Sequence, residues 1–386
     1  MAALVLINSN TGWSMDWGWA SLQASMPMLL VGPLLAGIVA HERARRFEPS
    51  LLQWARTTPR GRRALVGLAG GSLVWALASW IVALAWVTIA CLGDGAAGAV
   101  DLWVFVEVPV YLVLAASFGL LMGSVNRGIL IGPLAAVVFY LADILGDQMG
   151  VGGIFRVATT LGSMLDLERN PSYVLAALAV HISTALLFVA GAMRWSFPVV
   201  RRRVSWVQTG VFAVCTILSL INFMVVHDRG DVFRRATDPE RCADGTVRVC
   251  GPSKALPLSE VAARDLSVAV DGILAGSGIS WAQRYSWSST SPFPSDSGLL
   301  MFDLEGMSGG HLSRWDVAST LSTPRLCSAL FSAVDAPPLL EQQKKVHDWI
   351  VGRMEAASGA GNVEAPASVR EAYSILLSCP LAERMP

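Results

Sequence analysis

Three ionisable residues fall inside segments that otherwise carry almost no charge: Glu107, Asp143 and His181. Charge is costly in hydrocarbon, so such residues in a membrane segment usually mark a transport path, a proton relay or a pairing between helices. Glu107 and Asp143 also lie within about two helical turns of a segment end, so snorkelling to water is an equal alternative. His181 lies near the middle of its segment, where a packing histidine is the commoner case.

Other reactive groups do not form a catalytic pattern. No Gly-x-x-x-x-Gly-Lys-Ser/Thr phosphate loop surrounds any of the three lysines, Lys254, Lys344 and Lys345. His41-Glu42 resembles the start of a zinc helix, but position 45 is Arg instead of a second His. We therefore expect no enzyme activity, no metal and no cofactor in this chain.

Four cysteines lie in the last 160 residues, in a part that we expect to be outside the cell, where disulfides persist. They are Cys242, Cys250, Cys327 and Cys379. Three pairings are possible. We favour Cys242 with Cys250, which bracket an Asp-Gly turn, and Cys327 with Cys379; four free thiols are the alternative. Cys91 and Cys215 lie in apolar segments and are interpreted as small packing residues.

The composition indicates a membrane protein with a water-facing part. Of the 386 residues 53% are apolar and 15% charged, and the formal net charge is zero, which argues against disorder and against nucleic-acid binding by bulk charge. Residues 1–226 carry 14 basic and 10 acidic residues, whereas residues 227–386 carry 15 and 19. We therefore predict a transmembrane domain over 1–226 and an extracellular C-terminal domain over 227–386.

Runs of about 20 residues nearly free of charge predict a polytopic α-helical membrane bundle of about six transmembrane helices. The expected spans are Trp19 to Ala40, Ala64 to Ala90, Leu102 to Met122, Ile129 to Leu145, Tyr173 to Met193 and Val207 to Val226. Trp13, Trp17 and Trp19 precede the first span, either as an aromatic belt in the headgroup zone or as a short interfacial helix.

The distribution of basic residues indicates the orientation of these spans. Twelve of the 14 basic residues before position 227 fall in alternate connections, around 43–63, at 127 and around 194–203. The positive-inside rule makes these connections cytoplasmic. The chain is thus expected in the cell membrane as a multi-pass protein, with its N-terminus and its C-terminal domain outside.

The C-terminal domain is predicted to be helix-rich α+β. Ser259 is a candidate N-cap of a helix that runs to about Ala275, with Gly276 after its end. Further helices are expected near Leu312 to Thr320, Pro338 to Ala356 and Ala367 to Leu377, and short strands at Ser280 to Trp287 and Leu299 to Leu304.

The first cytoplasmic connection predicts a short amphipathic helix. Pro49 suits a first helical turn, Leu51, Leu52 and Trp54 give an apolar side, and Pro59 ends the segment. Such a helix must bury its apolar side against lipid, against its own bundle or against a partner protein.

This connection resembles the permease subunits of type-two ABC exporters. In that family an acidic-basic pair ends a span, and a short coupling helix follows that ends in Pro and basic residues. Glu42-Arg43, Leu51-Leu52-Gln53-Trp54 and Pro59-Arg60 stand in that order. Residues Gly146 to Asn170 correspond to the family's re-entrant hairpin. More particularly, the chain is similar to an actinobacterial-type subgroup with a C-terminal extracellular domain, over about residues 20–260.

The resemblance implies a permease that is driven by a separate cytosolic ATP-binding subunit, works with a second permease subunit and sits in a lipid bilayer. It implies partner-binding roles for Glu42, Arg43, Leu51, Leu52, Trp54, Pro59 and Arg60. The family's first span, expected before Trp13, is either absent here or reduced to the apolar run Met1 to Asn8, which is too short to cross a bilayer.

A different class of function is also compatible with the pattern. A membrane-anchored sensor or scaffold would use the same spans as an anchor and bind a ligand or an envelope protein through the C-terminal domain. The sequence carries no readable ligand motif, and lipid, peptide and small-molecule cargo are all open for a transporter.

Overall fold

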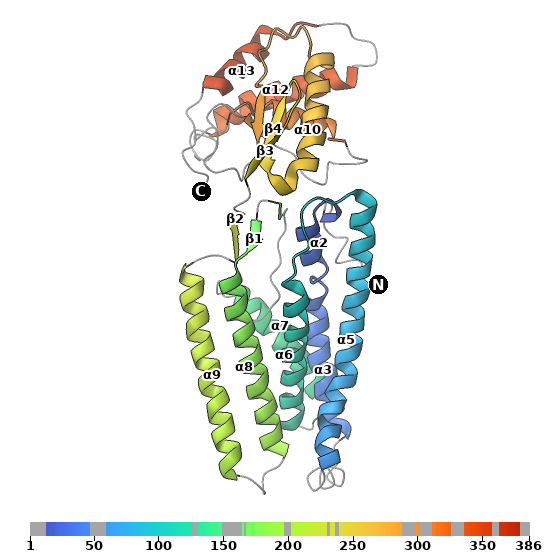
Figure 1. Cartoon of the computed structure of the whole chain (residues 1–386), viewed down its shortest axis with the longest axis vertical. Helices are drawn as coiled ribbons and strands as arrows, with labels where there is room; N and C mark the ends of the chain where they lie inside the picture. The colour runs from blue at the N-terminus through green and yellow to red at the C-terminus, as the bar shows by residue number, and fades with distance from the viewer. Residues whose placement is uncertain are drawn as a thin grey trace.

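The computed structural model describes residues 13–46, 59–125, 128, 130–148, 164–165, 167–196, 202–229, 232–235, 239–287, 298–300, 311–325, 336–356 and 363–378. A bundle of long helices occupies one end of the molecule, and a smaller region of helices and a sheet occupies the other (Figure 1). We call these two parts the bundle and the C-terminal region.

Five stretches of the bundle are long and apolar enough to cross a membrane, which confirms five of the predicted spans approximately. These stretches are Trp17–Arg45, Ala69–Asp94, Val104–Val125, Pro171–Met193 and Val207–His227. They belong to the helices α2 (Trp17–Gln23) with α3 (Met28–Arg46), α5 (Pro59–Asp94), α6 (Val104–Val125), α8 (Pro171–Ser196) and α9 (Arg202–Arg229).

The remaining predicted span corresponds to α7 (Ile131–Gln148). Its apolar part, Ile131–Leu145, is shorter than the other five. A helix that crosses the hydrocarbon layer of a bilayer needs about 20 residues. The sixth segment predicted from the sequence is therefore an apolar helix of the bundle whose apolar part is too short for the five-span group, and the prediction of a sixth crossing is not confirmed.

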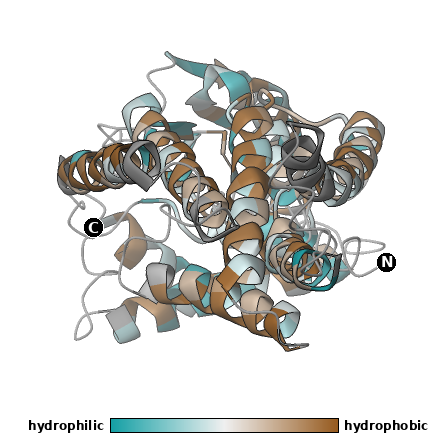
Figure 2. Ribbon diagram, turned by 90° about the horizontal axis from the view of Figure 1, so that it is seen from below, coloured by the Kyte–Doolittle hydropathy of each residue, from teal (hydrophilic) through white to brown (hydrophobic). Residues whose placement is uncertain are grey.

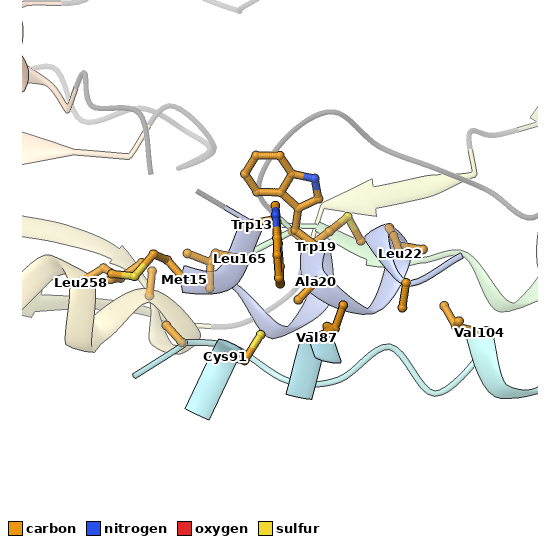
Figure 3. Close-up of a cluster of buried hydrophobic side chains, with 14 of the residues drawn as sticks. Trp13, Met15, Trp19, Ala20, Leu22, Val87, Cys91, Val104, Leu165 and Leu258 are labelled. Carbon is orange, nitrogen blue, oxygen red and sulfur yellow. The ribbon is translucent and has the colours of Figure 1, made fainter. Parts of the chain in front are cut away.

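The chain enters the bundle through two short helices, η1 (Trp13–Met15) and α2. Asp16 caps α2, because its Oδ1 accepts hydrogen bonds from the N–H groups of Gly18 (2.8 Å) and Trp19 (3.3 Å). Trp13 and Trp19 are 5% and 4% exposed. Figure 3 shows both rings within a buried cluster that also holds Val87 and Cys91 of α5.

This arrangement decides between the two interpretations of the N-terminal tryptophans. The segment consists of short helices, and the buried rings of Trp13 and Trp19 belong to the core instead of forming a belt that faces lipid. The same cluster includes Leu258, so the N-terminal helices lie between the bundle and the C-terminal region (Figure 3).

Helix α6 lies at the centre of the bundle and packs against α3 and α8 over much of its length. Small residues bring α3 and α6 close together: a Cβ at Gly119 would lie 2.4 Å from the carbonyl oxygen of Ala36. Close backbone approach at small residues is a common source of packing energy between membrane helices. The α3–α6 pair is thus closely packed around Gly119.

Helices α5 and α9 are peripheral. The apolar windows of α5 and α9 are 22% and 11% buried, against 61% for α6. Large apolar side chains on them are exposed, such as Trp75 (79%) and Val207 (66%). Figure 2, viewed from the end of the bundle remote from the C-terminal region, shows hydrophobic residues along the ribbons of the bundle. Outer faces of this kind suit contact with lipid.

A two-stranded sheet stands between the two parts of the molecule (Figure 1). Strand β1 (Leu167–Arg169) precedes α8, and β2 (Phe233–Arg235) follows α9. The strands pair antiparallel, with Arg169 opposite Phe233 and Glu168 opposite Arg234. The pairing joins the two upper ends of the α8–α9 hairpin.

The C-terminal region is α+β and helix-rich, as predicted. A four-stranded sheet has the order β3-β4-β5-β6, in which β3–β4 is an antiparallel hairpin and the other two pairings are parallel. The strands are β3 (Glu240–Ala243), β4 (Arg248–Pro252), β5 (Arg284–Ser286) and β6 (Gly298–Leu299). The helices are η3 (Ser253–Ala255), α10 (Leu256–Val268), η4 (Ala269–Ile273), α11 (Arg314–Leu321), α12 (Ala336–Ala356) and α13 (Ala367–Ser378).

The start of α10 differs from the sequence prediction. The helix begins at Leu256 with Pro in its first turn, a favoured place for Pro. Ser259 is therefore inside the helix instead of capping it, and its buried hydroxyl accepts a hydrogen bond from Trp287 Nε1 (3.0 Å). The predicted end is closer: the helical path continues to Ile273, and Gly276 follows with φ of +75°.

The hairpin β3–β4 carries the predicted disulfide between Cys242 and Cys250, which face each other in the strand register. Cys327 and Cys379 lie outside the described residues. Cys91 is buried, as expected of a packing residue, whereas Cys215 is exposed on α9, so its interpretation as a packing residue was wrong.

Candidate functional site

Charged and polar side chains gather on one face of α6, in the interior of the bundle. Glu107 and Tyr111 are four residues apart on this helix and so project from the same side, one turn apart. They are 5% and 1% exposed. Each is the centre of a separate polar cluster, which we call the upper cluster (Asp101, Glu107 and Arg169) and the lower cluster (Tyr111, Asp143 and His181).

The upper cluster pairs α6 with strand β1. Arg169 Nη2 donates a hydrogen bond to Glu107 Oε1, and Arg169 Nη1 lies 3.8 Å from Asp101 Oδ2. All three side chains are at most 7% exposed. The guanidinium carbon of Arg169 also lies 5.4 Å from the ring centroid of Phe233 on β2. A buried arginine needs such partners, because an unpaired buried charge costs several kcal/mol (about 3–5 when one partner of a buried pair is removed).

Asp101 precedes α6 and lies outside the spanning segment. Burial raises its pKa, while the charge of Arg169 and a hydrogen bond from the backbone N–H of Trp103 (3.1 Å) oppose that rise. Desolvation disfavours the charged carboxylate. The neutral form of Asp101 is thus easier to reach than for an exposed aspartate.

The lower cluster connects three helices around Tyr111. The Tyr111 hydroxyl donates a hydrogen bond to Asp143 Oδ2 of α7 at 2.7 Å. The His181 ring of α8 lies edge-on to Tyr111, with 6.4 Å between the ring centroids. Asp143 and His181 are 3% and 2% exposed. The tyrosine also fits against α3 at Gly32, where a Cβ would lie 2.5 Å from the Tyr111 hydroxyl oxygen.

All three path residues suggested by the sequence are therefore buried in the bundle. The structure brings Asp143 and His181 together around Tyr111, and it pairs Glu107 with Arg169 one turn higher on α6. The snorkelling interpretation of Glu107 and Asp143 was wrong, because both side chains lie in the protein interior.

Sequence reasoning missed Arg169 and Tyr111. A signal for Arg169 was present: it is one of only two basic residues before position 227 that fall outside the three basic connections. A lone arginine beside the membrane, on the side poor in basic residues, calls for an acidic partner, and the sequence offers two acidic residues inside predicted spans, Glu107 and Asp143. Tyr111 carries no comparable signal, since its hydroxyl becomes important only through its contact with Asp143.

Of the residues expected to bind a partner, those that the structure describes lie at the opposite end of the bundle. Glu42 and Arg43 form part of the last turns of α3, and Arg43 is 4% exposed beside Gly123 of α6. Pro59 is the first residue of α5, and Arg60 is the second. Leu51, Leu52 and Trp54 lie outside the described residues, and so does the greater part of Gly146 to Asn170.

Among the described residues no group of three or more His, Cys, Asp or Glu side chains is arranged to hold a metal ion. The chemistry that the two clusters offer is ion pairing, hydrogen bonding and proton exchange within a helical bundle. Comparisons with protein-family models, with curated proteins and with solved structures find no match for this chain.

Proposed function

We propose that this chain is the membrane permease subunit of an ATP-driven ABC-type exporter, coupled through the α3–α5 connection to a separate cytosolic ATP-binding subunit. The observation that carries the proposal is the place of this connection. Helix α3 ends at Arg46 and α5 begins at Pro59, both at the end of the bundle remote from the C-terminal region (Figure 1).

The charges at that end support a cytoplasmic placement. The end of α3, the start of α5, the end of α8 and the start of α9 all lie there (Figure 1), and the sequence between and beside these helix ends holds most of the basic residues of the bundle. The positive-inside rule then puts this end in the cytoplasm and the C-terminal region outside. A cytosolic ATPase reaches the connection after α3 directly.

A path of packed contacts leads from this connection to the opposite end. Helix α3 ends at the connection and packs closely on α6, with Arg43 against Gly123 near the cytoplasmic end. Helix α6 holds Arg169 through Glu107, and Arg169 belongs to the strand pair beneath the C-terminal region. A push on the connection therefore reaches α6 through α3, and it reaches the C-terminal region through Arg169.

The buried polar contacts of α6 give this path two discrete states. A hydrogen bond in a low-dielectric interior is either made or broken, and a broken one leaves a costly unpaired group. A shift of α6 relative to α7 or β1 would exchange the Tyr111–Asp143 and Glu107–Arg169 contacts for others. We propose that ATP-driven closure of the partner biases this exchange, which is the population shift that transport requires.

The proposal includes a second permease subunit. Peripheral helices α5 and α9 present exposed apolar faces to the membrane, where a second chain and lipid compete for contact. It also includes hydrolysis of ATP by the partner, since the three lysines of this chain lack a phosphate loop.

Affinity purification of the full chain in mild detergent tests the proposal. An ATP-binding subunit should co-purify and hydrolyse ATP. Replacing Leu51, Leu52 and Trp54 with Asp should remove this partner, whereas Leu340→Asp, at an exposed position of α12, should leave it bound. Complexes and transport that are unchanged in the triple variant would contradict the proposal.

Cysteine labelling in intact cells tests the orientation separately. A membrane-impermeant maleimide should label Lys344→Cys in the C-terminal region, and it should label Arg45→Cys at the end of α3 only after permeabilisation. Labelling of Arg45→Cys in intact cells would put the connection outside and out of reach of any cytosolic ATPase.

One observation favours the sensor or scaffold as a second candidate. The C-terminal region has an open hollow of about 830 Å³ between the disulfide hairpin and α10, lined among others by Cys242, Glu260, Arg264 and Val268. A hollow of this size accommodates a small ligand or a peptide side chain. Absence of any co-purifying ATPase, together with saturable ligand binding that Val268→Asp abolishes, would favour this function over the exporter.

A further inference from the structure

The loop between α5 and α6, residues 95–103, is fastened to the N-terminal helices by a few backbone groups. The N–H of Ala97 donates to a carbonyl oxygen of η1, and the carbonyl oxygen of Ala97 accepts from the first N–H of α2, both at 2.9 Å. The backbone N–H of Asp101 donates to Ser21 Oγ of α2 at 3.2 Å. Each such bond contributes little net stability, because the groups bond to water when the loop is released.

This loop is built to move at low cost. Gly95 and Gly98 have φ of +68° and +83°, in the left-handed region that glycine adopts without strain. Its larger apolar side chains add little packing, since Leu102 is 73% exposed and Val100 is 38% exposed. Segments with few buried apolar contacts open locally at a small free-energy cost. The charge of one side chain is therefore enough to shift the balance between a seated and a released loop.

That side chain is Asp101, which is 7% exposed. It shares one guanidinium with Glu107: Arg169 Nη2 donates to Glu107, whereas Nη1 lies 3.8 Å from Asp101 Oδ2, too far for a hydrogen bond. Asp101 Oδ1 accepts from the backbone N–H of Trp103 at 3.1 Å, and Oδ2 has no hydrogen-bond partner. Two buried carboxylates facing one cation leave a negative charge in excess, and Asp101 is the less well compensated of the two.

The surrounding charges do not remove this excess. In the described part of the chain, four other ionisable side chains line the cavity of about 310 Å³ beside Asp101: Asp16, Glu168, Arg234 and Lys254. Glu168 and Arg234 pair with each other at 2.9 Å. Asp16 accepts hydrogen bonds from three backbone N–H groups, and Lys254 has a partner as well. Two acidic and two basic groups balance, so the cluster keeps its excess negative charge.

The proton on Asp101 and the seated loop stabilise each other. Burial raises the pKa of Asp101, while the charge of Arg169 and the N–H of Trp103 oppose the rise. In a released loop the carboxylate is hydrated and its pKa returns to about 4. The proton therefore favours the seated loop. This stabilisation is complete below the ordinary pKa of an aspartate and is lost as the pH rises through the raised pKa.

We propose that residues 95–103 form a pH-sensitive strap, which a proton on Asp101 keeps seated against α2 and β1 and which loss of that proton releases. The proton passes from Asp101 Oδ2 to water in the adjoining cavity, which is large enough to admit it. The charged carboxylate then turns toward water, and the cavity between the bundle and the C-terminal region opens. Arg169 keeps Glu107 in both states. This inference goes beyond the exporter function and holds or fails independently of any ATPase partner.

Amide hydrogen exchange of the purified full chain in detergent tests the strap, measured by mass spectrometry at about pH 5 and about pH 8 and corrected for the intrinsic effect of pH on exchange. Protection of residues 95–103 should fall severalfold at the higher pH, while that of α6 stays unchanged. Asp101→Asn, which carries no charge, should keep the loop protected at both values. Asp101→Glu should restore the pH dependence.

Glu168→Gln is the matched control, because Glu168 lines the same cavity but is 30% exposed and paired with Arg234. It should show the pH dependence of the unchanged chain. Equal protection of residues 95–103 at both pH values, or a pH dependence that persists in Asp101→Asn, would overturn the proposal. If Asp101→Asn does not fold, the comparison of the unchanged chain with Asp101→Glu and Glu168→Gln decides: a loss of pH dependence in Glu168→Gln assigns the proton to Glu168 and refutes the strap.

Discussion

The ion pair between Glu107 and Arg169 allows a quantitative test of the upper cluster. Removing one partner of a buried pair typically costs about 3–5 kcal/mol, because the other charge stays buried without compensation. Glu107→Leu leaves Arg169 with one carboxylate, since its Nη1 still lies 3.8 Å from Asp101 Oδ2. We therefore expect the free energy of unfolding to fall by about 3 kcal/mol. Arg169→Met leaves two buried carboxylates without a cation, so we expect about 5 kcal/mol.

The double variant Glu107→Leu with Arg169→Met removes the pair as a whole and leaves only Asp101. Because one uncompensated carboxylate is left instead of two, we expect the double variant to cost about 3 kcal/mol instead of the sum of about 8, which is a coupling energy of about 5 kcal/mol. The free energy of unfolding of the full chain is measured in mixed micelles with increasing SDS, followed by tryptophan fluorescence.

A neighbouring Arg–Glu pair is the control. Glu168 and Arg234 belong to the same two strands, but their side chains are 30% and 56% exposed. Exposed pairs contribute about 0–1 kcal/mol, so Glu168→Gln should change the free energy of unfolding by less than about 1 kcal/mol. If Arg169→Met costs no more than this control, or if the two buried changes add without coupling, our account of the upper cluster is refuted.

Three further predictions concern packing, the disulfide and alkaline pH. Gly119→Val should lower the free energy of unfolding by about 3 kcal/mol or more, because its Cβ would lie 2.4 Å from a carbonyl oxygen of α3. The control is Gly70→Ala, which should be tolerated because a Cβ there would have no neighbour within 4 Å. The SDS unfolding measurement described above compares the two variants. Replacing Cys242 and Cys250 with Ala should lower the stability of the C-terminal region by about 2–3 kcal/mol, the value expected for a disulfide that closes a loop across 8 positions. Amide hydrogen exchange should become faster in β3 and β4 and should stay unchanged in α6. Burial raises the pKa of Tyr373 to about 12, so the unfolded chain loses this proton first and stability should fall as the pH rises from about 10 to 12; a phenolate absorbance at 295 nm that develops fully by pH 10.5 in the folded chain would contradict this.

Local patterns predicted the membrane part of the fold well. Hydropathy depends on composition along the chain, so the spans around Leu102 to Met122 and Tyr173 to Met193 match α6 and α8 closely. The disulfide between Cys242 and Cys250 was also predictable, since its two cysteines bracket a short turn. These features need no knowledge of how distant segments meet.

Features that depend on distant partners were missed. The burial of Glu107 follows from Arg169, 62 residues later, and the role of Tyr111 follows from Asp143 on another helix. Ser259 looked like a helix cap because Ser often starts helices, but Pro257 marks the first turn of α10 and the serine hydroxyl accepts from Trp287 instead. Local propensity could not decide these cases, because tertiary contacts outweigh it.

The strand pair β1–β2 has a consequence for how the C-terminal region is mounted. Along the chain the region is attached through β2 to α9, a helix that among the described helices packs extensively only on α8. A single attachment of this kind would let the C-terminal region rotate relative to the bundle. The three residue pairs between β1 and β2 add a second anchorage, next to the guanidinium that is tied to α6. Together with the contact of Leu258 in the N-terminal cluster, these two attachments restrict rotation of the C-terminal region about the long axis of the molecule.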